Sequence, residues 1–232
     1  MYIQLDSKIY KNIEIIFEND DFIIVNKPHG IAVIKGRNRI DDAVLYDILL
    51  TVYKKLYLVH RLDAPAGGLM AFAKNKLFCT HLTEQFEKHK VIKKYLCLCD
   101  GVLCAPLTTM LPISKRNFKG IYKVNFKSGK QAITTFFSLG HNTFKSIVLA
   151  MPLTGRTHQI RLHLKSIGVP IAGDFIYNKN FTTDNIKKIP LYAFSLQFDN
   201  FIFETKPSNY FISMVSRYNM ENILYQFFDK TL

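Results

Sequence analysis

The 232-residue chain has no tryptophan and no apolar run of the roughly 18 residues that a bilayer-spanning helix needs. Acidic residues interrupt residues 1–20, so neither a secretory signal nor a transit peptide is expected there. Hydrophobic residues make up 48% and charged residues 21%, values usual for a packed globular protein. We therefore expect a cytoplasmic protein that does not enter a membrane.

Cysteine is also scarce, because four residues in a chain of this length do not make a disulfide scaffold. No Cys-x-x-Cys pair occurs, and Cys97 and Cys99 alternate along a strand-like stretch, which is typical of buried thiols. His158 and His163 lack the i, i+4 spacing of a helical zinc site, and no third ligand is evident. We therefore expect no metal site.

Acidic residues are outnumbered, with 18 Asp and Glu against 31 Lys and Arg and a formal net charge of +13. A cationic surface attracts polyanions, largely through the release of counterions from phosphates. Composition favours a nucleic-acid partner, although a protein from a generally lysine-rich proteome would show the same excess.

The apolar pattern predicts more strands than helices. Alternation and turn residues predict strands within residues 13–25, 92–102, 131–139, 145–153 and 190–203, the first forming a hairpin about an Asn-Asp-Asp turn. Helical spacing predicts helices at 41–56, 73–91 and 214–228, the first beginning at Asp41 and Asp42. Residues 158–167 fit either a helix or a strand. The irregular order indicates an α+β fold, a single domain over residues 1–232 with a large mixed, mainly antiparallel sheet flanked by helices.

Residues 58–76 (LVHRLDAPAGGLMAFAKNK) read as a strand, a Pro/Gly loop and a second strand. Asp63 lies where the first strand meets the loop, and aspartate is a common turn former. A carboxylate can also attack a sugar carbon during glycosyl chemistry. Arg61 would share a strand face with Asp63 and favour the ionised carboxylate. The stretch alone leaves both interpretations open.

Two further segments carry chemically useful side chains. Tyr95 falls on a predicted strand, where it is either an ordinary half-buried tyrosine or a ring for stacking and proton transfer. Residues 155–161 (GRTHQIR) offer donors suited to phosphates and base edges, or form a solvated basic turn.

Taken together, these segments resemble one family. His60-Arg61-Leu62-Asp63 is followed by Gly68-Leu69, Lys93-x-Tyr95, the GRTHQIRLHL run at 155–164, and a Gly-x-Pro-Ile-x-Gly-Asp-x-x-Tyr pattern at 168–177. Asn26-Lys27-Pro28 and a Gly-Lys-x-Ala-x-Thr pattern at 129–134 agree with it. The chain resembles the RluA-type RNA pseudouridine synthases over about residues 13–203.

The resemblance implies the pseudouridine synthase fold and isomerisation of uridine to pseudouridine in a tRNA or rRNA stem-loop, without a cofactor. Asp63 is implied as the catalytic aspartate, Tyr95 as the ring against the uracil and Arg161 as the partner of Asp63. Arg61 is implied to fill the space of the flipped nucleotide. The residues expected to contact RNA are His60, Arg61, Lys27, Lys93, Lys115, Arg116, Lys123, Lys130, Arg156, His158 and Gln159.

The sequence also departs from the family pattern. Ala66 and Gly67 stand where hydroxyl residues are usual, which predicts a more flexible loop after Asp63. Tyr192 stands where histidine is frequent. About a dozen residues precede the pattern, so we expect a short monomeric form without an N-terminal S4 domain. The basic and aromatic block at 114–130 would then add grip on RNA.

Two other classes of protein stay open at this point. One is a non-catalytic RNA-binding protein or RNA chaperone on the same fold. The other is a glycosidic-bond hydrolase, which needs a second carboxylate that the residues around the motif do not offer.

Overall fold

The computed structural model describes residues 2–4, 12–36, 44–115, 121–179 and 188–229. Its strands are β1 (Tyr2–Gln4), β2 (Asn12–Glu18), β3 (Phe22–Lys27), β4 (Tyr57–Leu58), β5 (Gly67–Ala73), β6 (Ile92–Asp100), β7 (Leu107–Thr109), β8 (Ile113–Lys115), β9 (Tyr122–Val124), β10 (Thr134–His141), β11 (Lys145–Pro152), β12 (Leu191–Phe198) and β13 (Phe201–Glu204). The helices are α1 (Leu45–Leu50), α2 (Lys76–Glu87), α3 (Gln159–Ser166), α4 (Asn209–Ser216) and α5 (Glu221–Asp229).

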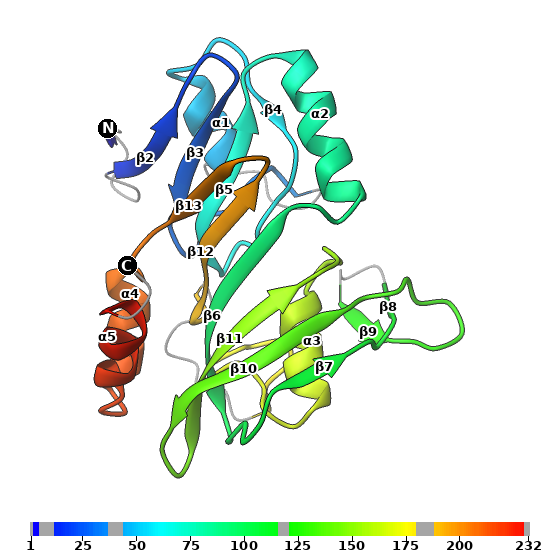
Figure 1. The fold of residues 1–232 in the computed structure, drawn as a ribbon, viewed down its shortest axis with the longest axis vertical. Coiled ribbons are helices and arrows are strands. Elements are labelled where there is room, and N and C mark those ends of the chain that lie inside the picture. The colour runs from blue at the N-terminus through cyan, green and yellow to red at the C-terminus, as the bar shows by residue number, and fades with distance from the viewer. Residues whose placement is uncertain (1, 5–11, 37–43, 116–120, 180–187, 230–232) are drawn as a thin grey trace.

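Eleven strands form one sheet, in the order β1-β2-β3-β5-β12-β6-β11-β10-β7, with β4 on β5 and β13 on β12. Every described pairing is antiparallel except β5 with β12. Figure 1 shows β6 running from the half that holds β2–β5 to the half that holds β10 and β11. The predicted α+β fold with a mixed, mainly antiparallel sheet is confirmed.

The alternation of side chains along β6 separates two cores. Leu96 and Leu98 pack with residues of α4 and α5, whereas Cys97 and Cys99 pack with residues of α3. Both thiols are fully buried, as their spacing predicted. Because successive strand residues point to opposite faces, Tyr95 lies on the side of α3.

Two local predictions need correction, and one that was left open between helix and strand is settled. Within the described residues the predicted helix at 41–56 is observed only as α1, whose N-cap residue Val44 is extended and whose C-cap residue Thr51 donates its hydroxyl to the Ile48 carbonyl; Asp41 and Asp42 lie outside the described residues. The predicted helix at 214–228 is divided between α4 and α5, since Asn219 takes a left-handed conformation with φ of 55°. Residues 158–167 contain a helix, α3, and no strand.

The predicted first strand before Asp63 is also much shorter than expected. β4 ends at Leu58, and the His60 Nε2 atom accepts a hydrogen bond from the Ala71 amide at 2.9 Å. The His60 ring therefore accepts the hydrogen bond of a β5 amide just beyond the end of β4, where a backbone carbonyl would otherwise be its partner. The premise that Arg61 and Asp63 share a strand face is wrong, because both lie in an irregular segment.

Candidate active site

Asp63 lies in a tightly held turn between β4 and β5. The Ala66 amide donates to the Asp63 carbonyl at 3.1 Å, and the Ala64 carbonyl accepts from the Gly30 amide at 2.9 Å and from the Lys27 Nζ at 3.2 Å. Asp63 is thus a turn residue through its backbone, while its side chain projects into a cavity. The two interpretations of Asp63 are compatible.

The expected loosening at Ala66 and Gly67 is contradicted by their packing. Ala66 is only 1% exposed, and Gly67 is the first residue of β5. A Cβ atom on Gly67 would lie 2.5 Å from the His29 ring. The His29 ring therefore fills the space in which a serine would sit, and the missing hydroxyls leave no gap.

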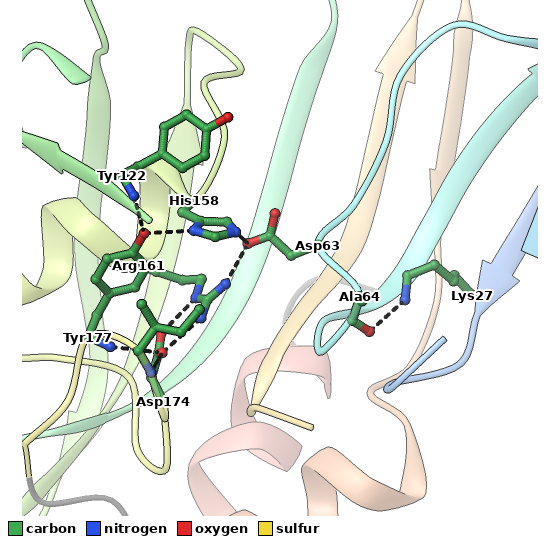
Figure 2. Close-up of polar contacts among 9 residues, drawn as sticks. Lys27, Asp63, Ala64, Tyr122, His158, Arg161, Asp174 and Tyr177 are labelled. Carbon is green, nitrogen blue, oxygen red and sulfur yellow. Dashed lines mark hydrogen bonds and ion pairs between the residues drawn. The ribbon is translucent and has the colours of Figure 1, made fainter. Parts of the chain in front are cut away.

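Arg161 joins the Asp63 turn to α3. Its side chain is 1% exposed, and its Nη1 donates to Asp63 Oδ2 at 3.1 Å. The other edge of the guanidinium donates to both oxygens of Asp174, at 2.7 and 2.8 Å. Burial opposes the charge of Arg161, but the hydrogen bonds and charges of Asp174 and Asp63 outweigh it and raise the pKa of Arg161. A permanently cationic group therefore orients the carboxylate (Figure 2).

Asp174 is the residue of this cluster to which the sequence assigned no role. It is fully buried, and its Oδ1 also accepts from the Ile176 and Tyr177 amides at 3.0 and 3.1 Å. The signal was present, because Asp174 and Tyr177 both fall within the motif at 168–177. A buried arginine needs more than one acceptor, and its second partner could have been sought in that motif.

His158 faces the Asp63 side chain with one ring nitrogen and contacts Tyr177 with the other. His158 Nε2 lies 3.9 Å from Asp63 Oδ2, and its Nδ1 lies 2.7 Å from the Tyr177 hydroxyl. The Tyr122 amide donates to the same hydroxyl at 3.1 Å (Figure 2). Burial lowers the pKa of His158 although the Asp63 charge opposes that shift, so the ring is neutral near pH 7.

The cavity above Asp63 has a volume of about 460 Å³, within the range usual for small-ligand sites. Its lining includes all three predicted catalytic residues, Asp63, Tyr95 and Arg161. Burial and the nearby Asp63 charge raise the pKa of Tyr95, so the ring is a neutral phenol. Glu87, the last residue of α2, also lines the cavity, and the sequence assigned it no role because it lies outside the motifs.

Four of the residues expected to contact RNA lie along the cavity wall with side chains that can face a ligand: Arg61, Lys93, Arg156 and His158. Arg61 is exposed, and Arg156 donates through Nε to the Gln131 carbonyl at 3.0 Å. Burial lowers the pKa of Lys93 to about 8, so the Lys93 ammonium is still mostly protonated at pH 7.

His60 also lines the cavity but differs from a phosphate-binding cation. Burial and the Lys93 charge lower the pKa of His60 to about 3, so its ring is neutral. The ring stacks on Phe86 with a centroid distance of 4.6 Å, and its Nε2 is occupied by the Ala71 amide. His60 therefore offers a ring face and an anchor for β5.

Two predictions of RNA contact are wrong. Lys27 is fully buried and its Nζ donates to the Pro28, Ile31 and Ala64 carbonyls at 3.0, 2.8 and 3.2 Å. Gln159 donates to Ile133 O and Thr134 Oγ1 and accepts from Thr154 Oγ1 and the Arg156 amide, at 2.8–3.0 Å. The polar side-chain atoms of Lys27 and Gln159 therefore form hydrogen bonds within the protein.

The remaining basic residues that the structure describes lie in or beside the β8–β9 hairpin. Lys115, Lys123 and Lys130 are exposed, and Arg116 lies outside the described residues. The Asn125 side chain accepts from the Lys127 and Ser128 amides at 3.0 and 3.2 Å and fixes the turn after β9. Phe126, at that turn, is 79% exposed.

No group of three or more potential metal-ligating residues occurs in the described part of the chain. Within the same residues, no helix is both long and apolar enough to cross a membrane.

Comparison with solved structures identifies the class of fold. The structure of human RNA pseudouridylate synthase domain containing 4 superposes with a TM-score of 0.74 at 22% identity, over 88% of this chain and 92% of that one. Human RNA pseudouridylate synthase domain containing 1 gives a TM-score of 0.71 at 27% identity, over 84% and 82% of the two chains. The fold is that of a pseudouridylate synthase domain.

Sequence comparison then identifies the family. The RNA pseudouridylate synthase family model matches residues 21–166. An uncharacterized RNA pseudouridine synthase of Haemophilus influenzae is 35% identical over 82% of this chain and 85% of its own length. The dual-specificity RNA pseudouridine synthase RluA of Vibrio vulnificus is 32% identical over 80% of this chain and 77% of its own length. The chain belongs to the RluA-type RNA pseudouridine synthases, enzymes that isomerise uridine in RNA.

Proposed function

We propose that this enzyme isomerises specific uridines in structured tRNA or rRNA, with Asp63 as its catalytic carboxylate. The observation that carries the proposal is the Asp63 side chain, held at 3.1 Å by a buried arginine inside a cavity lined by Tyr95. A carboxylate held in this way is oriented by a cationic partner, as attack on or stabilisation of a ribose C1′ requires.

In the proposed reaction the bond between N1 of the base and C1′ of the ribose breaks, and a bond between C5 and C1′ forms. The hydrogen lost from C5 is balanced by the one gained at N1, so no oxidant or leaving group is involved. Tyr95 supplies a neutral ring for stacking on the uracil, because burial raises its pKa. Arg161 holds the Asp63 side chain in place through its hydrogen bond to Oδ2.

A uridine within a stacked stem-loop cannot reach the floor of this cavity without leaving the stack. We propose that it flips into the cavity, at a cost of a few kcal/mol. Arg61 is exposed at the cavity wall, where its guanidinium can occupy the vacated position. Lys93 and Arg156 then neutralise nearby phosphates.

The class of RNA is proposed from the relatives. One relative is named a dual-specificity RNA pseudouridine synthase, and another, from Buchnera aphidicola, is named ribosomal large subunit pseudouridine synthase C, with 34% identity over 94% of this chain. The exposed lysines and Phe126 of the β8–β9 hairpin provide phosphate contacts and a stacking surface for either RNA.

The test is to incubate RNA from cells that lack this protein with purified enzyme and to map pseudouridine at single-nucleotide resolution. New sites with the wild type and none with Asp63→Asn are expected, and their location identifies the RNA. RNA binding without new sites in tRNA or rRNA would instead support a non-catalytic binding protein. Release of free uracil would indicate a hydrolase, which Glu87 in the cavity makes worth measuring.

A further inference from the structure

The two oxygens of the Asp63 carboxylate have different surroundings. Oδ2 accepts from Arg161 at 3.1 Å and faces His158 Nε2 at 3.9 Å. Within the described part of the chain, no donor reaches Oδ1 within hydrogen-bond distance. Figure 2 shows this second oxygen pointing away from both Arg161 and His158. One oxygen is anchored and the other is available to a substrate.

The contacts of the His158 ring favour one of its two neutral tautomers. The Tyr122 amide can only donate, so the Tyr177 oxygen accepts from it and its own hydroxyl proton is free to be donated to His158 Nδ1. The neutral ring then carries its proton on Nε2, facing the carboxylate. The opposite tautomer would direct a lone pair at the negatively charged Oδ2.

We propose that His158 is a positioning residue for Asp63, held in its tautomer by Tyr177 and by the β8–β9 hairpin, so that Oδ2 is anchored and Oδ1 is left to act on the ribose. The separation of 3.9 Å is slightly beyond hydrogen-bond reach, and such contacts commonly tighten when substrate binds. The proposal rests on the catalytic role of Asp63 proposed above.

The hairpin then contributes to turnover as well as to RNA binding. Besides its amide contact, Tyr122 places its ring edge-on to His158 at a centroid distance of 5.3 Å. The basic hairpin that faces solvent is thereby connected to the carboxylate through two side chains. The charged and titratable groups that surround Asp63 include Arg161, His158, Tyr95, Tyr177, Lys27 and Arg61.

The decisive experiment compares His158→Gln with His158→Asn. His158 has φ of 57°, a left-handed conformation that asparagine tolerates better than glutamine. The glutamine amide reproduces a donor near the Nε2 position, whereas the asparagine amide does not reach it. If His158 serves Asp63, the glutamine variant keeps the higher kcat, and if it serves only the backbone turn, the asparagine variant does.

We expect His158→Asn to lower kcat about 10- to 100-fold with KM nearly unchanged, the scale of a small misplacement of a reacting group. Tyr177→Phe should also lower kcat, since it keeps the ring that packs on Arg161 but loses the hydroxyl proton. Tyr46→Phe removes a hydroxyl hydrogen bond to Leu56 O of 2.8 Å away from the cavity and serves as the matched control.

A higher kcat for the asparagine variant, or wild-type kcat in all three site variants, would overturn the proposal. So would a Tyr177→Phe enzyme whose kcat and KM match those of Tyr46→Phe. Thermal unfolding of each variant confirms that folded enzymes are compared. Failure of the proposed function looks different, because Asp63→Asn would then retain isomerisation whatever the order of the His158 variants.

Discussion

Arg161 is the residue whose replacement most directly tests the site. Its guanidinium makes three hydrogen bonds to two carboxylates, and its side chain is 1% exposed. Replacing it with alanine leaves Asp174 fully buried with its two backbone amides as the remaining donors. Asp63 loses its anchor at Oδ2 at the same time.

The magnitude follows from the cost of an uncompensated buried charge. Removing one partner of a buried ion pair typically costs about 3–5 kcal/mol in the free energy of unfolding. For a protein of this size that corresponds to a fall in Tm of roughly 6–20 °C. Arg161→Lys keeps the charge but loses the bidentate geometry, so we expect a smaller fall in stability than for alanine.

The catalytic effect should exceed the effect on RNA affinity. Because Arg161 is buried beneath the cavity, we expect Arg161→Ala to lower kcat at least about 100-fold while the Kd for RNA changes less than about threefold. The assay combines single-turnover isomerisation with filter binding at a temperature where thermal unfolding shows the variant to be folded. Equal losses in kcat and affinity would show that Arg161 serves phosphates and would refute the reasoning.

Three further substitutions have defined outcomes. Burial lowers the pKa of Lys27 to about 7. Above that pH the unfolded chain binds more protons than the folded protein, so the free energy of unfolding rises with pH until the pKa of the unfolded chain is reached. Lys27→Met should remove up to about 1.4 kcal/mol per pH unit of that rise. Urea unfolding at pH 7 and pH 9 measures the change in the free energy of unfolding with pH. An equal change in the wild type and in Lys27→Met would contradict this prediction. Gly67→Ser should destabilise the protein by about 1–3 kcal/mol through contact with His29, and adding His29→Ala should recover part of the loss in a double-mutant cycle, whereas additive effects would exclude the contact. Lys123→Gln should reduce the slope of log affinity against log salt by about 0.7–0.9 without changing kcat, and an unchanged slope would mean that this lysine meets no phosphate.

The sequence predicted that Asp63 and Arg161 meet at the site. Asp63 and Arg161 are 98 residues apart, and their contact at 3.1 Å could be anticipated only through the family resemblance. Their spacing alone left Asp63 as a turn residue, which its backbone in fact is. Patterns of apolar residues predicted the strands well, because burial on a sheet face imposes a period of two.

The two failed predictions of RNA contact share one physical cause. Lys27 and Gln159 are polar residues in a recognised motif, and both were assigned to RNA. The structure instead uses their donors to tie backbone segments together, the Ala64 carbonyl in one case and the Ile133 carbonyl in the other. A sequence reports which polar groups exist, but their partners depend on which carbonyls the fold leaves without hydrogen bonds.

The site lies where the sheet changes from antiparallel to parallel pairing. Ala193 of β12 is in register with Gly68 of β5 on one side and with Tyr95 of β6 on the other. A Cβ atom on Gly68 would lie 2.2 Å from the Ala193 carbonyl oxygen, and φ of 114° at Gly68 favours glycine independently. Glycine therefore allows β5 to approach β12 closely, and the turn that carries Asp63 enters β5 just before this row. The short row from Gly68 through Ala193 to Tyr95 thus sets the spacing between the Asp63 turn and the strand that carries the Tyr95 ring. The geometry of the site therefore depends on the glycine pair Gly67-Gly68 that follows Asp63.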